Sequence, residues 1–126
     1  MKRYGGVLLI CKETNNFLLL KRNKKANFGN TWSIVSGGIE ENEPTLDGIK
    51  RELKEETQIN CKNIDFRLLE EQNNVIVPKF YFYLGYCDKE YQCILDMENT
   101  NYGWFNMKNL PDPLFPTLYS SLLRIF

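Results

Sequence analysis

Histidine is absent from this sequence of 126 residues. Its absence excludes the Ser–His and Cys–His nucleophile pairs and any zinc site built on imidazole. A hydrolytic reaction would therefore have to use carboxylates, a metal ion, lysine, arginine or tyrosine. The four cysteines, none in the CxxC spacing of a zinc or redox site, are Cys11, Cys61, Cys87 and Cys93. We expect each to be a small, buried side chain in a reducing compartment.

Long apolar runs are also missing. The run over residues 5–11 ends at Lys12 and Glu13, which makes it too short for most signal peptides or for the roughly 20 residues of a membrane span. The net charge is zero because 16 basic residues balance 16 acidic ones, so nothing indicates a general nucleic-acid surface. We expect a cytoplasmic protein that makes no membrane contact, either monomeric or a homodimer.

The remaining composition is that of one globular domain over residues 1–126, with 43% hydrophobic and 25% charged residues. The segment before Ala26 is basic, because only Glu13 opposes seven cationic side chains: Lys2, Arg3, Lys12, Lys21, Arg22, Lys24 and Lys25. Such a segment suits a phosphate ligand, and Arg22 is our candidate for a substrate contact. The alternative is an ordinary solubilising surface.

Apolar periodicity predicts strands and two helices. The expected strands cover residues 4–11, 17–20, 31–35, 64–69, 75–86, 91–95 and 102–105, and the expected helices cover residues 44–57 and 115–125. The first two strands should form a hairpin through residues 14–16. Each helix has one apolar stripe, so the two helices can bury their stripes only on opposite faces of a mixed sheet. The sequence therefore predicts an α/β fold.

The first helix carries an unusual concentration of acid. Glu52, Glu55 and Glu56 lie on one arc beside its apolar stripe, where each like-charged pair costs roughly 0.2–0.5 kcal/mol in water. Clustered carboxylates without thiolate or imidazole suit a hard divalent ion such as Mg²⁺ or Mn²⁺, often shared with substrate phosphates. For an isolated cluster, the alternative is a solvated helix face.

The residues around this helix favour the metal site. The segment 37–59, GGIEENEPTLDGIKRELKEETQI, resembles the signature of the Nudix hydrolases, GX5EX7REUXEEXGU, in which U is aliphatic. Every specified position matches except the last glycine, which is Gln58 here. Gln58 must either adopt a left-handed conformation, at a cost of about 1 kcal/mol, or extend the helix. Gly48, within the helix, indicates either close packing or room for a metal or phosphate.

The resemblance implies an α/β/α sandwich around a mixed, curved sheet and an enzyme that uses Mg²⁺, with Mn²⁺ possible. It identifies Glu52, Glu55 and Glu56 as metal ligands and catalytic residues. It also places Arg51 in the catalytic set, paired with Glu43 to brace the loop against the helix. Further ligands implied by the resemblance are a backbone carbonyl near Ser36 or Gly37 and the carboxylate of Glu98, for which Asp96 is the competitor.

The substrate is less well defined. Gly37 and Gly38 allow the main chain to approach a phosphate closely. Trp32, and with it Phe28, Tyr81 and Tyr83, can stack on a base, although strand aromatics are commonly core residues. Residues 75–77 lack the proline or tyrosine that marks relatives acting on ADP-ribose or dinucleoside polyphosphates.

The function implied by the resemblance is hydrolysis of a nucleoside diphosphate linked to another moiety. Two alternatives stay open: removal of a 5′ cap or pyrophosphate from capped or triphosphorylated RNA, and a nucleotide-binding module without catalysis. The intact acids Glu52, Glu55 and Glu56 favour the enzyme, because a site that had lost its activity would be expected to have lost at least one of them.

Overall fold

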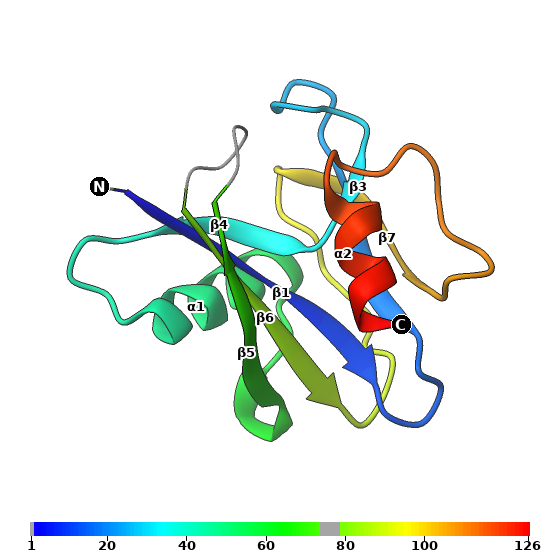
Figure 1. The fold of residues 1–126 in the computed structure, drawn as a ribbon, viewed down its shortest axis with the longest axis horizontal. Coiled ribbons are helices and arrows are strands. Elements are labelled where there is room, and N and C mark those ends of the chain that lie inside the picture. The colour runs from blue at the N-terminus through cyan, green and yellow to red at the C-terminus, as the bar shows by residue number, and fades with distance from the viewer. Residues whose placement is uncertain (1, 74–78) are drawn as a thin grey trace.

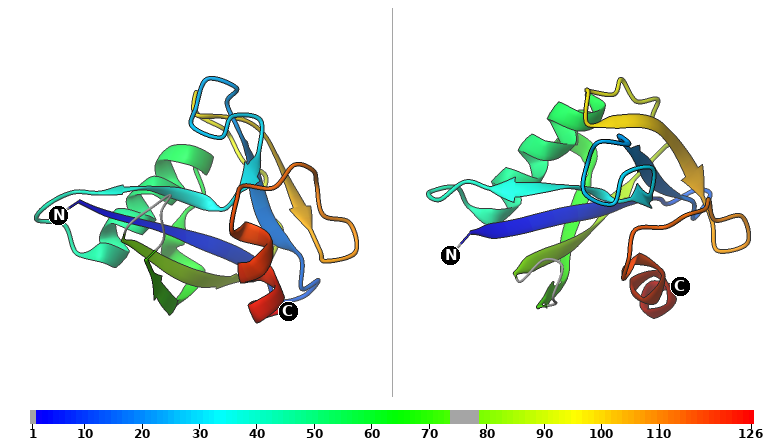
Figure 2. Two further views of the ribbon diagram at one scale, coloured as in Figure 1. Left: turned by 45° about the horizontal axis from the view of Figure 1, so that its top comes forward. Right: turned by 90° about the horizontal axis from the view of Figure 1, so that it is seen from above.

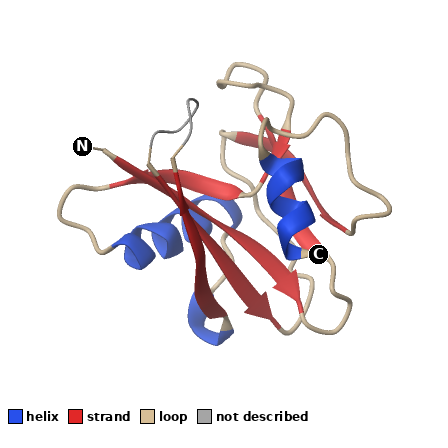
Figure 3. Ribbon diagram, in the orientation of Figure 1, coloured by secondary structure: helices blue, strands red, loops and turns tan. Residues whose placement is uncertain are grey.

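The structure, a computed structural model, describes residues 2–73 and 79–126. These residues form a seven-stranded mixed sheet with one α-helix on each face (Figure 1). The strands are β1 (Arg3–Cys11), β2 (Phe17–Arg22), β3 (Trp32–Ser33), β4 (Val35–Ile39), β5 (Asp65–Gln72), β6 (Phe80–Cys87) and β7 (Asn99–Phe105). The helices are α1 (Thr45–Thr57), the short 3-10 helix η1 (Cys61–Asn63) and α2 (Leu118–Ile125), all drawn in blue in Figure 3.

The sheet is organised around β1. One edge of β1 pairs in parallel with β6 along its whole length, from Tyr4 opposite Phe80 to Cys11 opposite Cys87. Its other edge pairs antiparallel with β4 over the first half and with β2 at the end. β2 in turn pairs with β3 and β7, and β5 pairs with the outer edge of β6. This change of partner along β1 divides the sheet into two parts that diverge (Figure 2).

Alternation along β1 produces two cores, one on each face of the sheet. Val7 and Leu9 belong to a buried cluster with Ile49 and Leu53 of α1. Leu8 and Ile10 point the other way, into a cluster with two leucines of α2, Leu118 and Leu122. Viewed from above, α1 and α2 lie on opposite sides of the sheet (Figure 2). The sandwich predicted from the two apolar stripes is therefore confirmed.

The helix α1 begins at Thr45, directly after Pro44, and ends at Thr57. Gln58 adopts the left-handed conformation, with φ 62°, and its N–H donates to the Lys54 carbonyl. The chain thus makes the turn that a glycine would make, at a cost of about 1 kcal/mol. No helix among the described residues has both the length and the apolar character needed to cross a bilayer.

The predicted start of the last helix was wrong. α2 begins at Leu118 and not at residue 115, because Thr117 has a left-handed conformation with φ 75° that interrupts any helix running through it. The first strands were predicted with only small errors at their ends. The strand expected over residues 31–35 is divided at Ile34, and its second part, β4, continues through the glycine pair to Ile39.

The strand predicted over residues 91–95 was also wrong, because this segment lies outside any strand. Its backbone is held by other groups: the Trp104 indole donates to the Tyr91 carbonyl, and the Ile94 N–H donates to the carbonyl of Thr57. Tyr91, Cys93 and Leu95 still pack against the core on the α1 side. Residues 75–78 of the predicted strand 75–86 fall outside the described residues.

The four cysteines are free thiols. Cys11 and Cys87 are buried neighbours on β1 and β6, whereas Cys61 and Cys93 are half-buried and pack against the same core. Burial raises the pKa of the Cys87 and Cys93 thiols to about 11. They act as small apolar side chains, as predicted, although two of them are less buried than expected.

Candidate active site

Three glutamates come together beside β4. Glu52 and Glu56, one helical turn apart on α1, meet Glu98, which directly precedes β7. One carboxylate oxygen from each lies within 4.8 Å of the others. The structure thus brings Glu98 to the helix acids, and the competing Asp96 instead accepts a hydrogen bond from the Glu98 N–H. Oxygen ligands in this arrangement suit Mg²⁺ or Mn²⁺.

Glu56 is the most unusual member of this cluster. Its side chain is 4% exposed, and one carboxyl oxygen accepts a hydrogen bond from the Asn99 amide at 3.0 Å. The other oxygen is buried without a hydrogen-bond partner among the described residues. Burial raises the pKa of Glu56 to about 9 and also raises the pKa of Glu52. A buried, unpaired oxygen next to two further carboxylates fits a cation site.

The short segment that carries Glu98 is held by the residue following β2. The Asn23 N–H donates to the Glu98 carbonyl at 2.9 Å, and the Asn23 side-chain amide donates to the Met97 carbonyl at 3.1 Å. These two bonds hold the peptide groups on both sides of Glu98. The position of Glu98 opposite α1 is therefore set by a residue some 75 positions earlier in the sequence.

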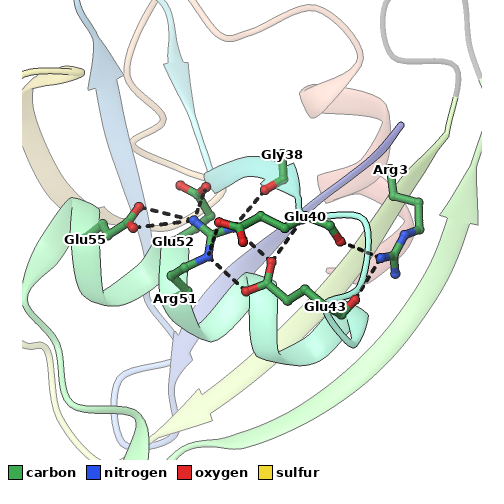
Figure 4. A network of polar contacts seen from close by, with 7 residues as sticks. All are labelled: Arg3, Gly38, Glu40, Glu43, Arg51, Glu52 and Glu55. Carbon is green, nitrogen blue, oxygen red and sulfur yellow. Dashed lines mark hydrogen bonds and ion pairs between the residues drawn. The ribbon is translucent and has the colours of Figure 1, made fainter. Parts of the chain in front are cut away.

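Arg51 braces the loop before α1 against the helix (Figure 4). Its guanidinium group binds both Glu43 oxygens, at 2.9 and 3.0 Å, and also donates to the Gly38 carbonyl and to Glu52, each at 3.0 Å. The Arg51 hydrogen bonds lower the pKa of Glu43 to about 2, while Glu43 and Glu52 raise the pKa of Arg51. Arg51 thus positions Glu52, and its donors are occupied by protein acceptors.

Glu52 lies against the backbone of β4. A Cβ added to Gly37 would lie 2.2 Å from the Glu52 carboxyl carbon, so the close approach requires glycine at that position. Glycine is needed at position 48 for a different reason, because an added Cβ there would lie 2.7 Å from Glu43 and 2.8 Å from Ile39. Of the two interpretations left open for Gly48, the contacts support close packing of the loop.

A cavity of about 640 Å³ opens beside the glutamates. Glu56 and Glu98 line it, together with Ser36, Gly37 and Gly38 and with the basic residues Arg22 and Lys25. Glu52 lines a neighbouring hollow with Lys2 and Arg3, and Gly38 borders both. The acidic cluster therefore lies where the two hollows meet.

A model of the NUDIX domain matches residues 1–124 of the chain. The chain belongs to the Nudix family. This membership supports a pyrophosphohydrolase that acts on acid anhydrides of phosphorus.

Solved structures show the same Nudix fold. A MutT/nudix family protein from Enterococcus faecalis is 28% identical over 83% of this chain, with a TM-score of 0.71, and the match spans 43% of that protein. An Ap4A hydrolase from C. elegans (19% identity, 84% of this chain and 81% of that chain, TM-score 0.72) shares the fold. So does an ADP-ribose pyrophosphatase from Streptococcus suis (20% identity, 97% and 87%, TM-score 0.69).

Two candidates from the sequence lie away from the centre of this Nudix site. Glu55 is exposed and contacts Arg51 at 3.4 Å, outside the cluster of three glutamates (Figure 4). Trp32 does not line the cavity, because its ring packs against the α2-side core in an edge-to-face pair with Phe105, with 5.3 Å between ring centroids. Of the other aromatic candidates, Phe28 lines the cavity, whereas Tyr83 packs on the α1 side.

Sequence reasoning missed several residues of the site. Phe80 and Phe82 line the cavity, but the run of four aromatics at the start of β6 gives no sign of which alternate pair faces it. Arg3 was counted only as a basic residue. In the structure its guanidinium donates to the Thr45 hydroxyl and to the carbonyls of three loop residues, Glu40, Glu41 and Glu43. This contact depends on the pairing of β1 with β4, which no local spacing reveals.

Proposed function

We propose that this Nudix protein, as a single domain over residues 1–126, is a metal-dependent hydrolase of a nucleoside diphosphate linked to another moiety. The observation that carries the proposal is the buried carboxyl group of Glu56, which has one oxygen without a hydrogen-bond partner among the described residues and lies with Glu52 and Glu98 beside a cavity of about 640 Å³. Cavities of roughly 300–1,000 Å³ suit ligands of nucleotide size. The cluster of three glutamates and the cavity beside it together suit a phosphorylated small molecule.

The metal is Mg²⁺, with Mn²⁺ as an alternative, and it is held by Glu52, Glu56 and Glu98. The carbonyl near Ser36 is a further candidate ligand, since Ser36 lines the same cavity. When bound, the ion supplies positive charge to the phosphate oxygens and makes a water molecule more acidic. Glu55, which contacts Arg51, contributes negative charge beside the site and does not complete the described cluster.

The chain's own residues have three tasks in this proposal. Glu52 or a neighbouring carboxylate accepts a proton from the attacking water, and Arg51 holds Glu52 in place by a 3.0 Å hydrogen bond. Arg22 and Lys25, on the cavity wall, bind phosphate oxygens by charge. Gly37 and Gly38 allow the backbone close to the phosphates.

The reaction needs no covalent enzyme intermediate. Water adds to one phosphorus atom, the bond from that phosphorus to the bridging oxygen breaks, and the leaving phosphate keeps the bridging oxygen. The water oxygen ends on one product, and each product carries phosphate.

The test replaces Glu52 and Glu56 separately by glutamine, which preserves shape and removes charge. We expect each change to lower metal-dependent turnover by about 10²–10⁴-fold, the usual contribution of a catalytic acid or base, without loss of folding. Products from a panel of nucleotide sugars, dinucleotides and capped RNA would be separated by chromatography. Glu13→Gln, an exposed position in the turn after β1, is the control for loss of one negative charge.

Full activity of both variants would contradict the assignment. Tight nucleotide binding without turnover by the wild-type protein would identify a binding module in place of an enzyme. Activity restricted to capped or triphosphorylated RNA would instead favour the RNA alternative.

A further inference from the structure

Glu56 occupies a position on α1 that otherwise carries apolar side chains. Ile49, Leu53 and Glu56 are spaced at i, i+4 and i+7, so the three side chains share the stripe that faces the sheet. Ile49 and Leu53 belong to the buried core, and Glu56 is 4% exposed. A carboxyl group in such a place needs a polar partner from the sheet, because burial of an unpartnered carboxyl group is unfavourable.

The partner from the sheet is Asn99, the first residue of β7. Its side-chain amide donates to one oxygen of Glu56 at 3.0 Å, and Asn99 is itself 8% exposed. This buried hydrogen bond joins two residues that are 43 positions apart in the sequence. The other Glu56 oxygen has no hydrogen-bond partner within residues 2–73 and 79–126. The bond to Asn99 therefore leaves one oxygen of Glu56 available to a cation.

Regular alternation along β7 would turn Asn99 away from α1. Tyr102 packs against the α1-side core and Phe105 against the α2-side core, as alternation along a strand requires. Continued backward from Tyr102, this alternation gives the α1 side to Thr100 and the opposite face to Asn99. The observed burial is the reverse, because Asn99 is buried and bonded to Glu56, whereas Thr100 is exposed.

A β-bulge accounts for this reversal. Lys21 of β2 pairs with Asn101, but the next residue of β2, Arg22, pairs with Asn99, so β7 has one extra residue at this point. An extra residue shifts the alternation by one position and re-aims the side chain beside it, a device common next to active sites. The amide of Asn99 thus reaches Glu56 because the strand is irregular here.

Asparagine suits this position because its amide is neutral. Arg51, in contrast, holds Glu52 with a cationic guanidinium group, which offsets part of the negative charge of that carboxylate. A second cationic side chain beside Glu56 would repel a bound metal ion. An amide donor fixes the oxygen that it contacts and leaves the charge of Glu56 for the ion.

Asn99 also follows Glu98 directly in the sequence. Glu98 belongs with Glu52 and Glu56 to the cluster of three glutamates, and its carbonyl accepts a hydrogen bond from the Asn23 N–H. Residues 98 and 99 therefore supply one carboxylate of the cluster and the hydrogen bond that holds another. This hydrogen bond ties the start of β7 to α1 at the site itself.

We propose that Asn99 is a positioning residue, which orients Glu56 so that its second oxygen meets the metal ion together with Glu52 and Glu98. The inference rests on the proposed function, because it concerns the same metal site, and it deepens that function by assigning a residue outside the signature segment 37–59. Asn99 acts through Glu56 and not on the reacting atoms. A hydrogen-bond partner behind a metal ligand typically contributes roughly 10–100-fold to metal affinity.

The first test measures Mn²⁺ affinity by calorimetry. Leucine has the branched shape of asparagine but no donor, so Asn99→Leu should weaken Mn²⁺ binding roughly 10–100-fold. Asn99→Ala, which removes the amide without placing a larger apolar group beside Glu56, should weaken it similarly. Asn101→Leu is the matched control and should bind Mn²⁺ as the wild type does, because Asn101 is exposed on the same strand and accepts from the adjacent Tyr102 N–H. Thermal unfolding with a chelator shows whether each variant folds.

A second measurement separates the positioning of Glu56 from a general structural role. Turnover of Asn99→Leu is followed as the Mn²⁺ concentration is raised. The Mn²⁺ concentration for half-maximal rate should rise by the factor found by calorimetry, whereas kcat at saturating Mn²⁺ should stay within several-fold of the wild type. Adding Asn99→Leu to Glu56→Gln should cause no further loss of Mn²⁺ affinity, because the carboxylate that Asn99 orients is gone.

The outcomes separate this inference from the function on which it rests. Unchanged Mn²⁺ affinity in Asn99→Leu and Asn99→Ala, with weaker binding in Glu56→Gln, would overturn the role of Asn99 and leave the proposed metal site intact. A lower kcat at every Mn²⁺ concentration without a change in affinity would also overturn that role. Weaker Mn²⁺ binding in Asn99→Leu, without hydrolysis of any nucleotide by the wild type, would support the role and refute the proposed hydrolase. Equal Mn²⁺ affinity in the wild type and Glu56→Gln would overturn both.

Discussion

The buried carboxyl group of Glu56 distinguishes the acidic face of α1 from a solvated surface. Glu52, Glu55 and Glu56 look equivalent on a helical wheel, yet their environments differ widely. Glu56 is 4% exposed and has one oxygen without a hydrogen-bond partner in the described part of the chain, Glu52 is held by Arg51, and Glu55 is exposed at the far side of Arg51. Spacing along the helix predicted one cluster of all three acids, but only Glu52 and Glu56 belong to the cluster that the structure forms with Glu98.

The raised pKa of Glu56 predicts how stability varies with pH in the metal-free protein. In the unfolded chain this group loses its proton near pH 4.5, whereas in the fold it keeps it to about pH 9. Stability contributed by the neutral group is therefore complete below pH 4.5 and is lost as pH rises toward 9. Glu56→Gln, which is always neutral, should gain stability relative to the wild type across this range.

Urea unfolding in the presence of a chelator, repeated from pH 5 to pH 9, measures the difference between Glu56→Gln and wild type. A difference in the free energy of unfolding that stays constant with pH would contradict the raised pKa of Glu56. Glu13→Gln, exposed in the turn after β1, should show no such trend.

Gln58 allows a second prediction at a single residue. The left-handed backbone conformation, with φ 62°, destabilises the fold by about 1 kcal/mol for a residue with a Cβ, but not for glycine. Gln58→Gly should therefore raise the free energy of unfolding by about 1 kcal/mol, whereas Gln58→Ala, which keeps the Cβ, should give no gain. Urea unfolding at neutral pH measures both, and equal stability of the two variants would show that the turn is not strained.

At the scale of elements, periodicity predicted α1 and the first hairpin strands, but not the start of α2 or the segment 91–95. The stripe of Ile49 and Leu53 predicted α1 to within one residue of its ends. The segment 91–95 has the apolar content of a strand, yet its backbone is held by the Trp104 side chain and by Thr57. The prediction that Trp32 contacts the substrate depended on local sequence as well. The local sequence around a tryptophan on a short strand does not show whether the side chain packs in a core or lines a cavity.

The loop between β4 and α1 depends on an arginine from a different element. Arg3 donates to the Glu40 and Glu43 carbonyls at 2.8 and 2.7 Å, while Arg51 binds the Glu43 carboxylate from the other side. We expect Arg3→Met to loosen this loop and, through Arg51 and Glu52, to lower kcat several-fold more than it raises KM. Each hydrogen bond from a charged group contributes about 1.5–3 kcal/mol to stability, so thermal unfolding of Arg3→Met checks that the fold persists.

Amide hydrogen exchange at Glu43, whose N–H donates to the Glu40 carbonyl, reports the loop directly. The exchange should be faster in Arg3→Met and unchanged in Lys2→Met, the neighbouring basic residue. Unchanged exchange in both variants would show that the loop does not depend on Arg3.

At the scale of the whole molecule, the sequence predicted the layers but not the order of the strands. The parallel pairing of β1 with β6 joins segments more than 70 residues apart, and no local pattern specifies it. That pairing, with the change of partner from β4 to β2, determines which residues surround the cavity. It places Glu98 opposite α1 and the phenylalanines of β6 beneath α2.

The site is thus a joint product of distant segments. The signature segment supplies Glu52 and Glu56, but the loop after β2 orients Glu98, and β5 and α2 both contribute to the lining of the cavity. The central claim is that this assembly holds a divalent ion between Glu52, Glu56 and Glu98 with the diphosphate beside it.

The most direct measurement is a crystal structure grown with Mn²⁺ and a non-hydrolysable nucleoside diphosphate analogue, with anomalous scattering used to locate the metal. We predict a manganese peak between the three carboxylates and the analogue's diphosphate in contact with it. A manganese peak elsewhere, with the three carboxylates bare and the analogue outside the cavity, would contradict the account.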